Sequence, residues 1–151
     1  MVYLNEILDV NNIAIIESGK HKKIIESLLD LVKKSPKITD FDVFKEAIWE
    51  REKIISTGIG LGLAIPHARR EIIKDFVGAV VLIKKGVEWK SIDDREVNLA
   101  ILVGSPQNTH KEYLQLLAQT VLLWKDDYKR KKILSSNTKE ELFDFLKEIK
   151  F

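Results

Sequence analysis

Two runs of almost uninterrupted apolar residues, 76–83 and 97–103, lie in the middle of the chain. Runs of this kind are typical of strands that are covered on both faces. A shorter apolar run at 13–16 predicts a third, brief strand near the start. Between the two long runs, Lys84-Lys85-Gly86 predicts a turn, and Val87-Glu88-Trp89 predicts an edge strand or hairpin arm.

Apolar residues that recur every three or four positions predict helices on both sides of these strands. The expected helices run through 25–32, ending near Ser35-Pro36, from Thr39 or Asp40 to about 53, and through 110–121, 126–134 and 138–149. The third of them follows a loop at 104–109 and carries one stripe made of His110, Leu114, Leu117, Ala118 and Val121. Thr138, with Glu141 three residues later, matches a capping box at the start of the last helix.

Strands interleaved with helices indicate an α/β fold, in which a central sheet of about five strands carries helices on both faces as a three-layer sandwich. The pattern itself leaves parallel and mixed sheets open, and we expect a mixed one. The chain has 151 residues, no internal repeat and no low-complexity linker. We therefore expect a single domain over residues 1–151.

Composition narrows the class of protein. The 25 Lys and Arg residues balance 23 Asp and Glu residues along the whole length, for a net charge of +2, so there is no basic field for nucleic acid. The absence of cysteine excludes disulfides and thiolate sites and fits a reducing compartment. No stretch approaches the roughly 18 apolar residues of a membrane span, and the first residues lack a secretory signal pattern. We expect a cytoplasmic protein without direct membrane insertion.

The most informative segment begins at Thr57 and reads Thr-Gly-Ile-Gly-Leu-Gly-Leu-Ala-Ile-Pro-His. Glycines at alternate positions expose backbone N–H groups, so Thr57, Gly58 and Gly60 are candidates for a phosphate cradle. The spacing does not match a dinucleotide fingerprint, and no P-loop is present. Considered alone, such a run is more often a flexible or bulged connection than a ligand site.

The chain has only three histidines, and His67 at the end of this segment is the candidate for chemistry. The strand-end loop at 104–109 is placed to bring His110 to the same rim of the sheet, where α/β sites tend to lie. His21 lies at a lysine-rich helix start and is expected to be a solvated surface residue. A metal site built from two histidines is the rival interpretation, but no third ligand has a defined spacing, so we expect no metal.

Arg51 ends the second helix just before the glycine segment. Its ordinary interpretation is a cation favoured by the helix dipole, or a partner in a surface salt bridge. The functional interpretation is a guanidinium directed at a phosphoryl group, because its forked donors suit charged oxygens better than lysine does.

These segments together resemble the enzyme IIA domain of the fructose/mannitol type from the bacterial phosphoenolpyruvate:sugar phosphotransferase system, a family that includes a nitrogen-regulatory branch. The resemblance rests on Arg51-Glu52, Ser56-Thr57-Gly58-Ile59-Gly60 and Leu63-Ala64-Ile65-Pro66-His67-Ala68, and it extends to Lys22–Leu29, Gly86–Trp89 and Pro106–Ala118. Ala68 stands where the family usually has glycine, and Arg69-Arg70 is less typical and is expected to affect which partner docks.

The resemblance implies that His67 takes a phosphoryl group from the phosphocarrier HPr and passes it to a IIB domain for sugar uptake. It implies that Arg51 and His110 stabilise the phosphate and that Nε2 of His67 is the reacting atom. Transfer between two imidazoles needs in-line geometry and charge stabilisation, so no cofactor is expected.

Two alternatives stay open at this point. The first is a nitrogen-regulatory type of protein, in which phosphorylated His67 controls docking to a regulatory target. The second is a structural α/β protein in which the histidine has no function. The sugar, the IIB partner and the oligomeric state cannot be read from this sequence.

Overall fold

The computed structural model describes residues 2–54, 56–89, 93 and 95–150. Its central element is a six-stranded sheet with the order β1-β5-β6-β3-β2, in which β4 also pairs with β6. The strands are β1 (Ile13–Ile16), β2 (Gly58–Gly60), β3 (Leu63–Ala64), β4 (His67–Arg70), β5 (Val77–Val87) and β6 (Val97–Pro106).

The sheet is mixed, as expected. β1 runs parallel to β5, and β5 runs antiparallel to β6. Both β3 and β4 run parallel to β6, one after the other along its length. Since proline has no N–H to donate, Pro66 interrupts this edge of the ladder between β3 and β4.

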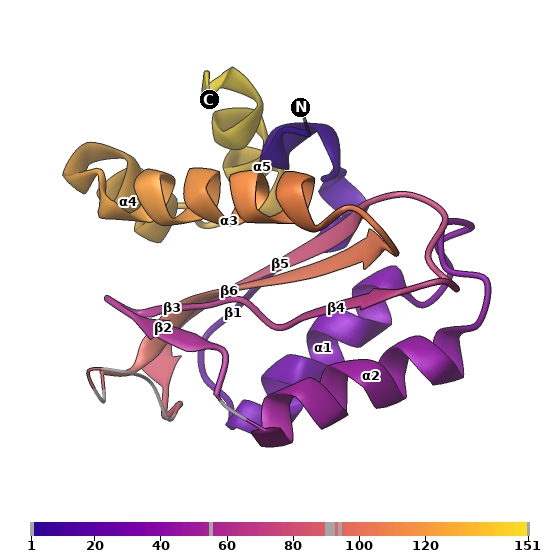
Figure 1. Ribbon diagram of the computed structural model, residues 1–151. Coiled ribbons are helices and arrows are strands. Elements are labelled where there is room, and N and C mark those ends of the chain that lie inside the picture. The colour runs from indigo at the N-terminus through magenta and orange to yellow at the C-terminus, as the bar shows by residue number, and fades with distance from the viewer. Residues whose placement is uncertain (1, 55, 90–92, 94, 151) are drawn as a thin grey trace.

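Helices cover both faces of the sheet, so the three-layer α/β sandwich is confirmed (Figure 1). One face carries α1 (His21–Val32) and α2 (Phe41–Ile54). The other face carries α3 (His110–Lys125), α4 (Asp127–Leu134), α5 (Lys139–Glu148) and the short 3-10 helix η1 (Leu4–Glu6). A second 3-10 helix, η2 (Val10–Asn12), directly precedes β1 and contacts both α1 and α5. Within the described part of the chain, no helix is both long enough and apolar enough to cross a membrane.

The central strands contribute to a core on each face. Along β5, Val81 and Ile83 pack toward α1 and α2, whereas Val80 and Leu82 pack toward α3 and α5. Successive side chains of a strand point to opposite faces, so an apolar run without alternation fits a strand with two covered faces.

Two strand boundaries differ from the sequence prediction. The predicted turn at 84–86 is wrong, because β5 continues through it to Val87, which pairs with Val97. Gly86 takes a positive φ of 78° at an irregularity in the register, so it accommodates a bulge and no turn forms there. The loop expected from 104 onward begins later, because β6 continues to Pro106 and pairs with β4.

The helices lie close to their predicted positions, but the buried side of α3 differs from the predicted stripe. Its buried residues are Tyr113, Leu116, Thr120, Leu123 and Trp124. Leu114, which belonged to that stripe, is 47% exposed. At the start of α5 the expected cap is present, with the Thr138 hydroxyl accepting a hydrogen bond from the Glu141 N–H at 3.1 Å.

Candidate active site

His67 is the first residue of β4 and directly follows the interruption at Pro66. The turn at this interruption brings the Ile65 carbonyl oxygen to 2.9 Å from His67 Nδ1. The imidazole is half-buried, and its ring centroid lies 4.8 Å from that of Tyr113 on α3. The side chain is thus held on one side by the backbone and on another by an aromatic ring.

This contact decides where the imidazole carries its hydrogen. A carbonyl oxygen only accepts, so Nδ1 must be the donor, and the lone pair of neutral His67 resides on Nε2. Burial has the largest effect on the pKa of His67 and lowers it. The Ile65 hydrogen bond and Glu52 raise this pKa, the Arg51 and Arg69 charges lower it, and the net shift is downward. At neutral pH the ring is therefore in its nucleophilic form.

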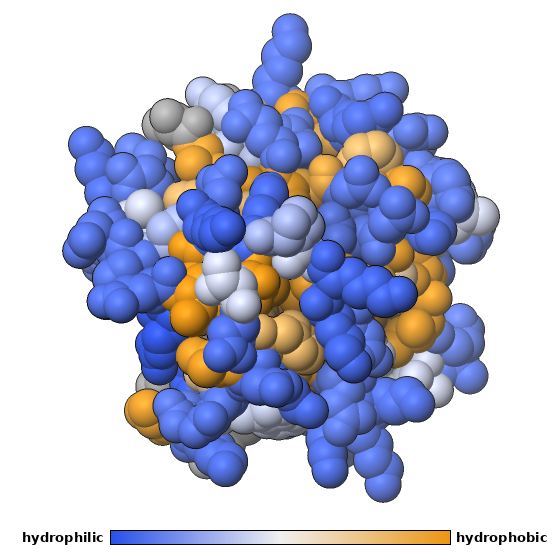
Figure 2. Space-filling model, turned by 90° about the vertical axis from the view of Figure 1, so that its right-hand side faces the viewer, coloured by the Kyte–Doolittle hydropathy of each residue, from blue (hydrophilic) through white to orange (hydrophobic). Residues whose placement is uncertain are grey.

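His67 lines an open cavity of about 390 Å³ between α2, the sheet and the start of α3. The lining residues are Ala47, Glu50, Arg51, Ile54, His67, Ala68, Arg69, Arg70, Ser105, Gln107, His110 and Tyr113. The structure therefore brings Arg51, His67 and His110 together, although they are far apart in sequence. β4 and β6 run parallel, so both end at the side of the molecule seen in Figure 2. On this side, hydrophilic side chains surround smaller apolar areas.

Arg69 also lines this cavity, and the sequence did not predict its part in the site. It lies two residues after His67 on β4, so both side chains extend from the same face of the strand. Arg69 Nη1 contacts His110 Nδ1. An arginine only donates, so His110 accepts at Nδ1 and keeps Nε2–H as a donor. Strand periodicity applied to His67 is the signal that would have identified Arg69.

Thr57, Gly58 and Gly60 of the glycine segment are not among the residues that line this cavity. Gly58 N–H already donates to the Ser56 hydroxyl at 3.1 Å. The segment forms the hairpin of β2 and β3, whose turn uses positive φ angles at Gly60, Leu61 and Gly62. The backbone cradle expected at Thr57, Gly58 and Gly60 therefore stays a prediction.

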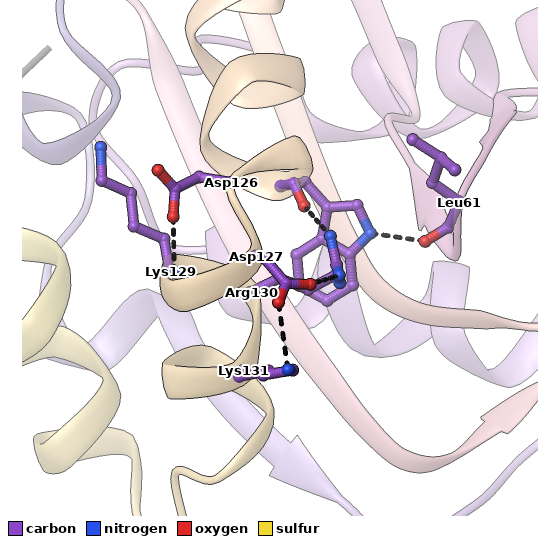
Figure 3. A network of polar contacts seen from close by, with 7 residues as sticks. Leu61, Asp126, Asp127, Lys129, Arg130 and Lys131 are labelled. Atoms are coloured by element: carbon purple, nitrogen blue, oxygen red, sulfur yellow. Dashed lines mark hydrogen bonds and ion pairs between the residues drawn. The ribbon is translucent and has the colours of Figure 1, made fainter.

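Hydrogen bonds to residues outside the hairpin hold its turn in place. Leu61 N–H donates to Asp93 Oδ2 at 2.9 Å. The Leu61 carbonyl accepts from Trp124 Nε1 at 2.6 Å, the contact drawn at Leu61 in Figure 3. Trp124 in turn accepts a hydrogen bond at its own carbonyl from Arg130 at 3.0 Å. These contacts attach the glycine hairpin to α3 and α4, which indicates a structural role for the turn.

His21 is not the solvated surface residue that the sequence predicted. Its Nε2 lies 2.9 Å from Glu52 Oε1, and its ring centroid lies 4.2 Å from that of Trp89. Burial raises the pKa of Glu52, but hydrogen bonds from His21 and Thr57 outweigh it, so the net shift is downward and the carboxylate is ionised. The prediction failed because the buried acceptor lies 31 residues away in the sequence.

The chemistry available in the cavity is anion binding next to a nucleophile. Arg51, Arg69 and Arg70 supply guanidinium groups, and His110 supplies an N–H donor. Arg70 also lies 3.8 Å from Glu50, a contact between two exposed side chains. Among the residues with described positions, no group of three or more His, Asp or Glu side chains is arranged to hold a metal ion.

Residues 6–149 match the family model described as phosphoenolpyruvate-dependent sugar phosphotransferase system, EIIA 2. The PTS system fructose-specific EIIABC component of Bacillus subtilis is 28% identical over 146 residues, which cover 96% of this chain and 23% of that protein. The chain thus spans about a quarter of that relative. The nitrogen regulatory protein of Pseudomonas aeruginosa is 27% identical over 150 residues, covering 99% of this chain and 97% of that protein.

The fold of the chain is also similar to that of a solved structure with a related name. The crystal structure of nitrogen regulatory protein IIA-Ntr from Neisseria meningitidis superposes with a TM-score of 0.84 at 27% identity, covering 95% of this chain and 98% of that chain. The family model covers almost the whole chain, including all the residues that line the cavity. The chain therefore belongs to the EIIA type 2 family of the phosphoenolpyruvate-dependent sugar phosphotransferase system, whose members are phosphotransfer components.

Proposed function

We propose that this chain is a phosphoryl relay, in which His67 Nε2 accepts a phosphoryl group from phosphorylated HPr and passes it to a IIB domain for sugar uptake. The observation that supports it most directly is the Ile65 contact, which reserves the lone pair of His67 for Nε2 in a cavity lined by cations. Because phosphoenolpyruvate-derived phosphate is the donor in this family, the proposed site of action is the cytoplasm.

The proposed step needs no proton transfer. Nε2 of His67 forms a bond to phosphorus while the N–P bond of the donor phosphohistidine breaks, and the donor ring leaves as neutral imidazole. His67 keeps its proton on Nδ1 throughout, hydrogen-bonded to Ile65. The ring therefore becomes cationic as its phosphoryl group arrives, and the carbonyl oxygen beside Nδ1–H favours that change.

The side chains of the cavity stabilise the charge of the phosphoryl group in this proposal. Arg51 and Arg69 are the guanidinium groups whose charges act on His67. His110 has its remaining N–H available, because Arg69 occupies Nδ1. Transfer of this kind depends on positioning and on electrostatic stabilisation.

The test is to incubate the purified chain with labelled phosphoenolpyruvate, enzyme I and HPr, and to look for acid-labile phosphate. We expect label on His67 of the wild type and none on His67→Ala, which removes the nucleophile. His110→Ala is expected to become labelled more slowly and to reach the same final level, because it retains the nucleophile. An unlabelled wild type, or equal labelling of His67→Ala, would contradict the proposal.

A second candidate function is phosphorylation-dependent regulation. The observation in its favour is the match to the Pseudomonas nitrogen regulatory protein, which covers nearly all of both chains. To separate the two functions, the phosphorylated chain is mixed with a purified fructose-type IIB domain. Loss of label from His67 to IIB supports the relay in sugar uptake, whereas label that stays on His67 favours the regulatory candidate.

A further inference from the structure

Glu52 is a buried carboxylate that the proposed phosphoryl transfer does not use directly. Its side chain is 3% exposed and lies next to Arg51 in sequence, at the end of α2. Its oxygens accept three hydrogen bonds: Oε1 from His21 Nε2 at 2.9 Å and Trp89 Nε1 at 3.1 Å, and Oε2 from Thr57 Oγ1 at 2.6 Å. An ionised carboxylate with this set of donors is fixed in place.

Three hydrogen bonds, joined through the covalent structure of Thr57 and Ile65, connect this carboxylate to His67. Thr57 binds Glu52 through its hydroxyl, and its carbonyl oxygen accepts from Ile65 N–H at 3.0 Å. The carbonyl oxygen of Ile65 then accepts from His67 Nδ1 at 2.9 Å. Thr57 is itself 2% exposed, so water does not compete for these groups.

The Ile65 peptide lies where the sheet ladder is interrupted. Ala64 still pairs with β6, and pairing resumes at His67. The N–H of Ile65 bonds to the Thr57 carbonyl, so the position of Ile65 depends on where Thr57 is held. Glu52 holds Thr57 from the opposite side, at the end of a helix in another layer.

We propose that Glu52 and Thr57 are positioning residues, which hold the Ile65 carbonyl against Nδ1 and so keep His67 in the tautomer with its lone pair on Nε2. This inference rests on the proposed function for its effect on transfer, but its effect on the tautomer does not require any partner protein. Fixing the tautomer of a reacting histidine through its other ring nitrogen is a general requirement of imidazole chemistry.

The experiment compares Thr57→Val, Thr57→Ser and Thr120→Val. Thr57→Val keeps the shape but removes the hydroxyl, and Thr57→Ser restores it. Thr120→Val is the matched control, because Thr120 is also buried but bonds to Leu116 within α3. The tautomer of His67 is read from ¹⁵N–¹H spectra above the pKa of the ring, and folding is checked by circular dichroism.

We expect Thr57→Val to raise the fraction of His67 with hydrogen on Nε2 and to slow labelling by HPr about 10-fold to 100-fold, the range known for outer partners of metal-ligating histidines. Thr57→Ser and Thr120→Val should retain the wild-type tautomer and rate. Glu52→Gln is the second variant, for use if Thr57→Val does not fold, and it should show the same tautomer change.

A folded Thr57→Val or Glu52→Gln with the wild-type tautomer fraction would overturn the positioning role, whatever its labelling rate. An unlabelled wild type whose tautomer still responds to Thr57→Val would instead support the positioning role and refute the proposed relay. The spectra therefore test the positioning role and the labelling assay tests the relay, each independently of the other.

Discussion

At the scale of single residues, the reactivity of His67 comes from its surroundings more than from its own type. A free imidazole exchanges its hydrogen between two nitrogens, whereas the Ile65 carbonyl keeps it on Nδ1 here. Burial and the neighbouring guanidinium groups keep the ring neutral. The pH dependence of His67 labelling and the effect of replacing Arg69 can therefore both be predicted from the contacts of these two residues.

The rate of labelling by HPr should be insensitive to pH across the ordinary pKa of histidine. Because the pKa of His67 is lowered below the usual value of 6.5, the ring stays neutral as the pH falls through that value. The rate is expected to fall only at lower pH, where Nε2 takes up a proton. An NMR titration of the His67 ring checks this, and a midpoint at or above 6.5 would contradict it.

Arg69→Ala should slow labelling of His67 by about 10²-fold, the effect of losing one preorganised donor to a developing charge. Arg69→Lys should fall between this variant and the wild type, because it keeps the charge but not the forked donors. Arg130→Ala, on α4 outside the cavity, is the control and should keep the wild-type rate. A rate for Arg69→Ala within twofold of the wild type would remove Arg69 from the charge-stabilising set.

At the scale of elements, helix α3 shows how a periodic pattern can be assigned to the wrong face. Leucine occurs at 114, 116, 117, 122 and 123, so several apolar stripes can be drawn along the same helix. The sheet selects the one that contains Tyr113, Leu116, Leu123 and Trp124. Tyr113 thereby reaches the ring of His67, and the start of α3 reaches the cavity.

Leu116→Ala and Leu114→Ala should differ sharply in their effect on stability. Leu116 is fully buried, so its truncation is expected to cost about 2–5 kcal/mol of unfolding free energy. Leu114 is 47% exposed, and its truncation should change stability by less than about 0.5 kcal/mol. Urea unfolding of the two variants measures this, and equal losses would contradict the difference in burial between Leu116 and Leu114.

At the scale of the whole molecule, the three layers place titratable groups where folding changes their pKa. His67 and Glu52 both have pKa values below their ordinary ones of 6.5 and 4.5. In each case the unfolded chain binds a proton at a higher pH than the folded chain does. The sign is therefore the same for both groups: acid favours the unfolded state.

The difference in unfolding free energy between the wild type and His67→Gln should change as the pH falls below 6.5, with the wild type losing more. The corresponding difference for Glu52→Gln should appear below pH 4.5. Urea titrations at a series of pH values measure both. Parallel curves for the wild type and His67→Gln would show that folding does not shift the pKa of His67.

Much of this architecture was predictable because it depends on local pattern. The buried strands at 76–83 and 97–103 and the helices beside them follow from hydrophobic spacing, and the family follows from the residues around His67. The bulge at Gly86 and the continuation of β6 to Pro106 were not predictable, since both depend on what the neighbouring strand offers. The domain count over 1–151 stays a prediction.

By itself, the sequence determined the family, the layer order and the identity of His67, Arg51 and His110 as candidates, because each depends on residue type and spacing. Only the tertiary structure decided that Arg69 meets His110, that His21 binds Glu52 and that the glycine hairpin does not line the cavity. The physical reason is that these contacts join segments tens of residues apart. Their geometry follows from strand pairing and burial, which no local pattern contains.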